Sequence, residues 1–163
     1  KNRGWYVGSM GLNLGRAGAG RYVGYVSPFE QAVRYVKENQ INGHSLAEDP
    51  AIVDKLAEMY CDAQATRLFT MRSLSFSERG AANPTYEISS EKIWGPDFAV
   101  RSTEVINQML GPYGQLWKGS ELAPDDGEFA RRFLAAMMTT VGHGSVEVMR
   151  DAIARRGLGL PRS

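Results

Sequence analysis

The sequence predicts an all-α fold, an antiparallel four-helix bundle. Apolar residues recur at three- and four-residue spacings through four long stretches of the chain, and no segment alternates convincingly as a strand. Turns rich in glycine and proline separate these stretches. Because the helices are long and amphipathic and the loops are short, antiparallel packing is the most economical arrangement.

The first helical stretch is expected from about Trp5 to Asn39, and its first half is rich in glycine. Each glycine costs up to about 1 kcal/mol of helix propensity relative to alanine, but small residues also let another backbone approach closely. We therefore expect this helix to lie centrally in the bundle, with Gly11, Gly15 and Gly18 turned toward another helix. Ser27–Glu30 has the pattern of a cap, a first-position proline and a capping-box glutamate, so the stretch can bend or restart there. The glycines are Gly4, Gly8, Gly11, Gly15, Gly18, Gly20 and Gly24.

The second helix has clear start and stop signals. A polar loop precedes it, Asp49 is the expected cap, Pro50 takes the first helical position, and the helix should end near Gly80. Its helically spaced apolar residues are candidates for the core. They are Ile52, Leu56, Met59, Ala63 and Leu68.

The third helix should follow the turn at residues 81–84, with Thr85 as its cap, and should run to about Leu110. The turn-forming segment Gly111–Gly114 ends it sharply. Its core candidates are Ile93, Val100, Val105, Ile106 and Met109.

The fourth helix is expected after a loop, where Asp125 and Glu128 have capping-box spacing. Gly142–Gly144 interrupts the helical pattern, and a last helical piece runs from Val146 to Arg156. We expect the methionines of the chain to fill gaps in the core. The core candidates of the fourth helix are Phe129, Phe133, Leu134, Met137 and Met138.

Length and composition fit one domain over residues 1–163, because 43% hydrophobic content in a chain of 163 residues can form a buried core. Lys and Arg total 19 against 18 for Asp and Glu, so the net charge of +1 provides no basic field for nucleic acid. No apolar run approaches the roughly 18 residues that a membrane span requires. A nucleic-acid-binding protein and a membrane-spanning protein are therefore not expected.

The single cysteine, Cys61, excludes an intrachain disulfide and favours a reducing compartment. Its place in a helical pattern suggests a small buried thiol. No leader-like segment opens the chain, so the cytoplasm is the expected location. Residues 1–5 resemble the interior of a domain more than a natural start, which suggests a fragment.

The end of the chain contains the most specific pattern. Residues 144–162 read G-S-V-E-V-M-R-D-A-I-A-R-R-G-L-G-L-P-R. This run resembles the ending of the acyl-CoA dehydrogenase C-terminal domain, G-T-S-E-I-Q-R-N-I-I-A-x-R-x-L-G-L-P-R. Agreement over so long an ordered run exceeds what a generic capped helix would give.

Earlier segments resemble the same family. Gln108–Gly114 is similar to its Q-x-x-G-G-x-G segment, with Lys92 where the family has a lysine in the preceding helix. Leu12–Gly20 resembles the L-x-x-E-R-A-x-x-G opening of the family's long first helix, and Gly43–Met59 resembles its F-G-x-P-L-A-D run. Together these segments cover nearly the whole chain.

The resemblance implies a flavoenzyme in which FAD takes a hydride from the β-carbon of an acyl-CoA thioester while a glutamate removes the α-proton. It also makes the acyl chain an alternative neighbour of Gly11, Gly15 and Gly18. It implies a dimer or tetramer of acyl-CoA dehydrogenase subunits, with electron-transfer flavoprotein as the acceptor, acting in lipid or sterol side-chain β-oxidation. The family's N-terminal helical domain and middle β-domain are absent from this chain.

The catalytic base of the family has two alternative positions, and neither holds a carboxylate here. The first corresponds to His143 and the second to Gly15. If the two-residue difference in the spacing to Tyr35 is placed elsewhere, the second position corresponds to Asn13 instead. Glycine cannot act as a base. A neutral imidazole can, because it is present at pH 7, so His143 is a base, a contact of substrate or flavin, or a loop residue with no chemical role.

Five positions match flavin contacts of the family: Gln108, Gly111, Gly114, Ser145 and Glu147. Ser145 also suits the cap of the last helix, and Gln108 suits a solvated helix end. Arg16 matches the arginine of the E-R pair and is a candidate for substrate binding, with a surface salt bridge as the alternative. Asn39 replaces the family's arginine in R-x-x-F-G, which removes a fixed cation from the cofactor's pyrophosphate. No metal site is expected.

Three functions follow from these observations. The chain belongs to an ordinary acyl-CoA dehydrogenase with His143 or another residue as base, or to a catalytically silent partner subunit whose companion brings the glutamate. The third is a non-enzymatic helical module for association. Some bacterial members of the family that act on steroid side chains use the second arrangement.

Overall fold

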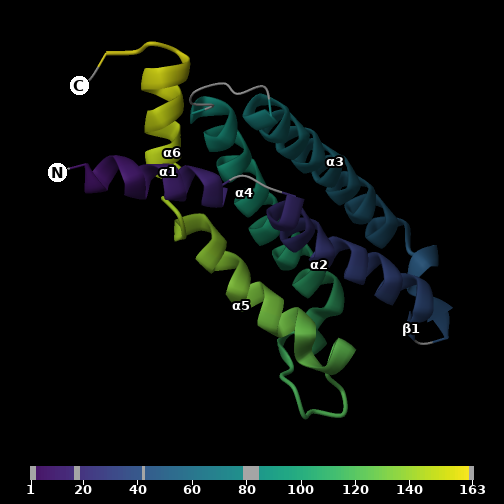
Figure 1. Cartoon of the computed structure of the whole chain (residues 1–163). Coiled ribbons are helices and arrows are strands. Elements are labelled where there is room, and N and C mark those ends of the chain that lie inside the picture. The colour runs from purple at the N-terminus through teal and green to yellow at the C-terminus, as the bar shows by residue number, and fades with distance from the viewer. Residues whose placement is uncertain (1–2, 17–18, 42, 79–84, 162–163) are drawn as a thin grey trace.

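The fold was analysed in a computed structural model that describes residues 3–16, 19–41, 43–78 and 85–161. Six α-helices and a short hairpin make up this part of the chain (Figure 1). The helices are α1 (Gly4–Arg16), α2 (Ala19–Glu38), α3 (Pro50–Glu78), α4 (Thr85–Leu110), α5 (Glu128–Val141) and α6 (Val146–Ala152). The short elements are β1 (Gln40–Ile41), β2 (His44–Ser45), the 3₁₀ turns Leu46–Glu48, Gly111–Gln115 and Pro124–Gly127, and a π turn at Ile153–Gly157.

Helix α4 is the centre of the molecule, because α2, α3, α5 and α6 all pack against it. The predicted all-α, antiparallel four-helix bundle is confirmed in α2 to α5. Within the described residues, the backbones of α2 and α5 stay apart although both helices lie on α4, and the Tyr35 and Phe129 rings pack edge-on between them. The main core forms where α2, α3 and α4 meet, and it includes Phe98 and Ile106, which are 1% and 2% exposed.

The first stretch forms two helices, α1 and α2, which run in different directions, and Ala17 and Gly18 between them lie outside the described residues (Figure 1). Helix α2 continues through Pro28, so the expected cap at Ser27 does not restart it. A Cβ at Gly11 would meet nothing within 4 Å. The close approach that we expected is therefore not found at Gly11, and the surroundings of Gly15 and Gly18 lie outside the described part of the chain.

The hairpin between α2 and α3 was not predicted from the sequence. Gln40 pairs with Ser45 across a turn in which Gly43 has φ 80°, and Leu46 is buried just beyond it. Strands of two residues are too short to show alternation. The start of α3 is as predicted, since Asp49 Oδ1 accepts a hydrogen bond from Ala51 N at 2.8 Å.

The predicted capping box at α5 is wrong. Asp125 and Asp126 are both left-handed, with φ 50° and 51°, and Gly127 takes the N-cap position with φ 78°. The Asp125 carboxylate instead accepts a hydrogen bond from Gln31 Nε2 of α2, which ties the loop to the bundle. Helix α5 therefore begins at Glu128, three residues after the expected cap.

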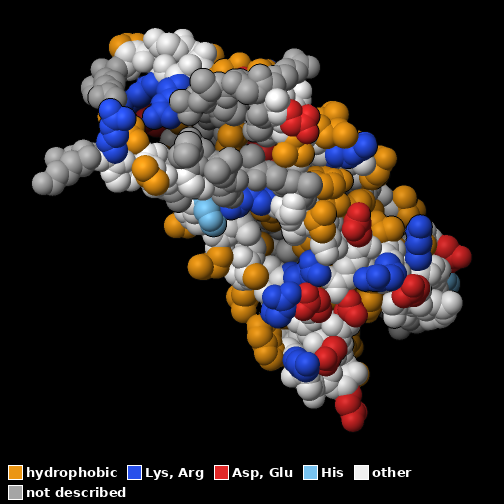
Figure 2. Space-filling model, viewed as in Figure 1, with side chains coloured by type: hydrophobic (Ala, Val, Ile, Leu, Met, Phe, Trp, Pro, Cys, Tyr) orange, Lys and Arg blue, Asp and Glu red, His pale blue; other side chains and the backbone are white. Residues whose placement is uncertain are grey.

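Exposure corrects several core assignments. Cys61 is exposed, so the prediction of a buried thiol is wrong. Most of the expected core of α5 is exposed as well, because only one face of that helix packs on α4. Figure 2 shows hydrophobic side chains along an edge of α5. The expected core residues found exposed are Leu68, Phe133, Leu134, Met137 and Met138.

Candidate functional site

The loop between α5 and α6 holds the candidate base position. Gly142 N closes α5 by donating to Met138 O at 3.0 Å, and Ser145 begins α6 as its N-cap. Between them His143 has φ 63° and Gly144 has φ 104°. A left-handed conformation is uncommon for a residue with a side chain. This short turn joins α5 to α6, which continues along α4 toward Tyr86 near its start, and it leaves His143 on the surface (Figure 1).

Ser145 and Glu147 lie together at the start of α6. Ser145 Oγ accepts a hydrogen bond from Val148 N at 3.5 Å, so the capping role suggested by the sequence is confirmed. Glu147 is exposed, and a hydrogen bond with Ser145 and one with its own backbone lower the pKa of its carboxyl group. Glu147 is therefore an anion at neutral pH, at a helix end that favours negative charge.

A pocket of about 320 Å³ lies beside this loop, over α4 and between α5 and α6. Trp94 and Val146 are part of an apolar lining, while Asp97 and Arg150 bring opposite charges to it. The pocket is large enough for part of a small molecule. Its full lining is Ile93, Trp94, Asp97, Val100, Met137, Thr140, Val146 and Arg150.

Gln108, Gly111 and Gly114 lie at the other end of α4. Gln108 is exposed, Gly111 has φ 57°, and Gly114 is buried where a Cβ would lie 2.7 Å from Asn107 Oδ1. Gly111 thus adopts a left-handed conformation that ends α4. Gly114 has no side chain, which allows the backbone to pack closely against Asn107 of α4. Helical rise places Gln108 about 22 Å along α4 from the pocket residue Ile93. One chain therefore does not bring the two groups of flavin candidates together.

The remaining candidate positions lie on α1 and at the end of α2. Gly15 and Arg16 belong to α1, but the surroundings of their side chains, and those of Asn13, lie outside the described part of the chain. Asn39 Nδ2 donates to Tyr35 O at 2.8 Å, so its amide closes the end of α2.

Two charged residues of α4 are buried. Lys92 matched a lysine of the family in the sequence but its burial was not predicted, and Glu91 was missed. Glu91 and Lys92 are each 1% exposed. Glu91 Oε1 accepts from Thr70 Oγ1 at 3.0 Å, and Lys92 Nζ donates to Thr139 O at 2.6 Å. Burial raises the pKa of Glu91, although hydrogen bonds from Ser73 and Thr70 oppose this. The sequence signal for their burial was their position in a helix, where apolar residues surround them along the chain.

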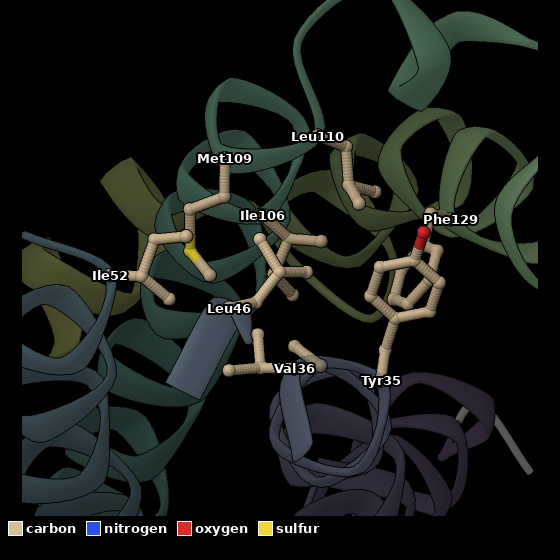
Figure 3. A pocket seen from close by; sticks show the side chains of 9 residues that line it. Tyr35, Val36, Leu46, Ile52, Ile106, Met109, Leu110 and Phe129 are labelled. Carbon is tan, nitrogen blue, oxygen red and sulfur yellow. The ribbon is translucent and has the colours of Figure 1, made fainter. Parts of the chain in front are cut away.

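Figure 3 shows a further cavity, at which side chains from α2, α3, α4 and α5 and the turn after the hairpin converge. The lining includes Val36, Ile52 and Met109, and the free volume is about 10 Å³. This volume is close to that of a single water molecule, so the cavity belongs to the core and is no substrate site.

The comparison with known families decides the identity of the fold. The family model described as "Acyl-CoA dehydrogenase, C-terminal domain" matches residues 2–158. This chain belongs to the acyl-CoA dehydrogenase family. The family that the sequence resembled is thus confirmed, and the match includes the terminal motif as far as Leu158.

Individual acyl-CoA dehydrogenases agree with this assignment. An acyl-CoA dehydrogenase of Bacillus subtilis (strain 168) is 29% identical over 158 residues, which cover 96% of this chain and 39% of that protein. Butyryl-CoA dehydrogenase from Megasphaera elsdenii superposes with a TM-score of 0.81 at 27% identity, covering 97% of this chain and 39% of that one. The "Tcur3481-Tcur3483 steroid ACAD" gives a TM-score of 0.81 at 25% identity, covering 93% and 38%. The chain thus spans about two fifths of its relatives' length.

The described residues contain no group of three or more His, Cys, Asp or Glu that could hold a metal ion. None of the described helices is both long and apolar enough to cross a membrane.

Proposed function

We propose that this chain is the C-terminal bundle of a cytoplasmic, FAD-dependent acyl-CoA dehydrogenase acting in lipid or sterol side-chain β-oxidation. The reaction is the α,β-dehydrogenation of an acyl-CoA thioester. The observation that supports it most is the α5–α6 loop, in which Ser145 caps α6 and Glu147 follows as an anion beside a pocket. The motif of this loop belongs to a family whose members perform that reaction.

FAD would be held by two groups of residues. Ser145 and Glu147 would meet it at the start of α6, and Gln108, Gly111 and Gly114 at the end of α4. Gln108 is exposed and a Cβ at Gly111 would meet nothing within 4 Å, so that end is accessible. When bound, FAD would accept the hydride and pass electrons to electron-transfer flavoprotein.

The separation of the two groups supports an oligomer. A span of about 22 Å along α4 suits an extended dinucleotide that one subunit contacts at its flavin end and its neighbour at the adenosine end. A dimer or tetramer of acyl-CoA dehydrogenase subunits would provide both contacts. Arg16 would then lie toward the substrate, on the same side as the positions of Gly15 and His143 in the family motif.

A catalytically silent subunit is the second candidate, and the base position favours it. His143 is on the surface in a left-handed turn, and the loop from Gly142 to Ser145 contains no carboxylate. The steroid ACAD among the structural relatives joins two named proteins. In such an assembly a partner subunit would supply the glutamate. The third candidate, a module for association only, would bind no flavin.

Substitution of His143 separates these functions. A working base contributes about 10²- to 10⁴-fold to the rate, so His143→Ala should reduce acyl-CoA oxidation by that factor if His143 is the base. In a silent subunit the same change should leave kcat within about twofold. Arg155→Ala, which removes only a pair with Asp151, is the matched control.

Flavin content and activity test the proposal as a whole. The parent protein is purified alone and together with the product of its neighbouring gene, and flavin absorbance and acyl-CoA oxidation are recorded. Yellow protein that turns over alone indicates an ordinary dehydrogenase, and activity only with the partner indicates the silent subunit. Colourless, inactive protein in both preparations would overturn the enzymatic proposals.

A further inference from the structure

A second, separate pocket lies between α2 and α5. It has a volume of about 220 Å³ and is floored by Ala99 and Thr103 of α4. The pocket lies where the backbones of α2 and α5 stay apart on α4, because side chains there are small. It shares no lining residue with the pocket beside the α5–α6 loop, although both pockets border α4 and α5.

Small side chains leave this pocket open. Gly24 and Pro28 form its α2 wall, and Ala135 and Ala136 form much of its α5 wall. A Cβ at Gly24 would meet nothing within 4 Å, so the space there is unfilled. An apolar cavity of about 150 Å³ can hold a benzene ring. The larger pocket here therefore has room for a short aliphatic chain.

Positive charge collects at one end of the pocket, where Arg131 and Arg132 lie on α5. Both guanidinium groups pair with the one carboxylate of Glu128, at 2.5 Å and 2.8 Å. Arg132 Nη1 also donates to Ser27 Oγ at 3.0 Å. Two cations thus share one anion, and Figure 2 shows basic and acidic side chains side by side on this face.

Glu128 remains ionised over the ordinary pH range. The hydrogen bond from Arg131, with a further one from Arg132, lowers the pKa of Glu128 to about 2. Arg131 holds this carboxylate through both Nε and Nη2, at 2.6 Å and 2.5 Å, and Arg132 reaches it through Nε. The three side chains together carry one net positive charge, which favours an anion beside them. Arginine presents several donors in one plane, which suits a carboxylate.

We propose that this pocket binds a small monocarboxylic acid with an unbranched aliphatic chain of about eight carbons, its chain along Ala99 and Ala135 and its carboxylate on Arg131. Apolar walls and a net positive charge at one end are the two features that such an amphiphile requires. The site does not depend on the flavin, on the base position or on the proposed dehydrogenation.

Binding of octanoate to the purified chain tests the proposal by isothermal titration calorimetry. We expect saturable binding of one octanoate per chain with a Kd of about 1 mM or tighter, because a ligand of this size can reach that affinity. Arg131→Gln should weaken it about tenfold through loss of a charged hydrogen bond. 1-Octanol, which lacks the charge, should bind more weakly than octanoate.

Filling the pocket should abolish binding without unfolding the protein. Gly24→Leu places a side chain in open space and improves helix propensity, so binding should fall at least about tenfold while the thermal melt remains cooperative. Ala135→Leu fills the pocket from the opposite helix and serves as the second variant. Gly20→Leu, on the same helix but outside the pocket, and Arg155→Gln are the matched controls.

Three results would overturn the proposal. Wild-type protein that shows no saturable binding of octanoate excludes the site. Unchanged binding in both folded filling variants places the ligand elsewhere. Equal affinity for 1-octanol and octanoate, or no effect of Arg131→Gln, excludes recognition of the carboxylate.

Discussion

At the scale of single residues, the contact between Tyr25 and the α4 backbone sets how closely α2 approaches. Tyr25 is 5% exposed, and a Cβ added at Gly95 would lie 2.5 Å from its Cδ2. The overlap between this Cβ and Tyr25 cannot be relieved by a small side-chain rotation, because the Tyr25 atoms belong to a rigid, buried ring. Gly95 is therefore required for packing rather than for backbone conformation.

Gly95→Ala should destabilise the chain by about 1–3 kcal/mol, because overpacking outweighs the gain in helix propensity. Gly20→Ala is the control, since its Cβ meets nothing within 4 Å and alanine should stabilise the helix by up to about 1 kcal/mol. Denaturant unfolding measures both changes. Equal stabilisation of the two variants would show that Tyr25 moves aside freely.

Glu91 couples the stability of the bundle to pH. Burial raises the pKa of this carboxyl group, so the folded chain holds its proton more tightly than the unfolded chain does. The stability gained from Glu91 is full below its ordinary pKa and is lost as the pH rises through the raised value. Glu91→Gln keeps the hydrogen bond from Thr70 and removes the ionisation.

Glu91→Gln should therefore melt at a higher temperature than the wild type at neutral pH, and the difference should shrink as the pH falls toward 4. Thermal melts across this pH range provide the measurement. Glu121→Gln, on the exposed loop before α5, is the matched control. A variant that melts lower than wild type at neutral pH would contradict the prediction.

At the scale of elements, helix starts show how local signals define the bundle. Asp49 caps α3 through its bond from Ala51 N, whereas α5 begins after three left-handed residues that end at Gly127. The first start depends on neighbours in sequence. The second depends on the bond between Asp125 and Gln31 of α2, far away in the chain.

Asp49→Ala should cost about 1 kcal/mol of stability, the usual loss for a removed N-cap. Asp49→Asn should recover most of it, because its side-chain oxygen can accept the same bond. Denaturant titrations followed by far-UV circular dichroism test both variants. Equal stability of Asp49→Ala and the wild type would mean that Pro50 and tertiary packing alone fix the start of α3.

At the scale of the whole molecule, much apolar surface remains exposed. Leu134 and Met138 on α5 are 61% and 75% exposed, and Trp5 on α1 is 78% exposed. Large exposed apolar areas usually mark interaction surfaces. This surface supports the proposal that the chain works within an oligomer.

Leu134→Glu combined with Met138→Glu should disrupt an association through α5 while leaving the fold intact. We expect the variant to sediment as a smaller species than the wild type. Its thermal melt should remain cooperative, which would show that the fold is intact. Glu substitutions at the exposed polar residues Lys37 and Gln40 are the control. An unchanged oligomer would place the contact on another surface of the chain.

The sequence alone determined the local features of this protein. The start of α3 follows from Asp49 and Pro50, and the end of α4 from the breakers after Leu110, because caps and helix breakers act on neighbouring residues. Thr85, the expected cap of α4, is instead its first helical residue. The terminal motif also indicated the family, because a motif is defined by the order of residues along the chain. Ser145 as the cap of α6 also needed no tertiary information.

Only the tertiary structure decided which faces are covered. Periodicity showed that Leu134 lies on an apolar face and that Glu91 lies in a helix, but not that the first is exposed and the second buried. It likewise did not predict the pocket between α2 and α5, which results from how both helices lie on α4. Burial and pockets depend on contacts between segments distant in sequence, and a single helix does not specify its neighbours.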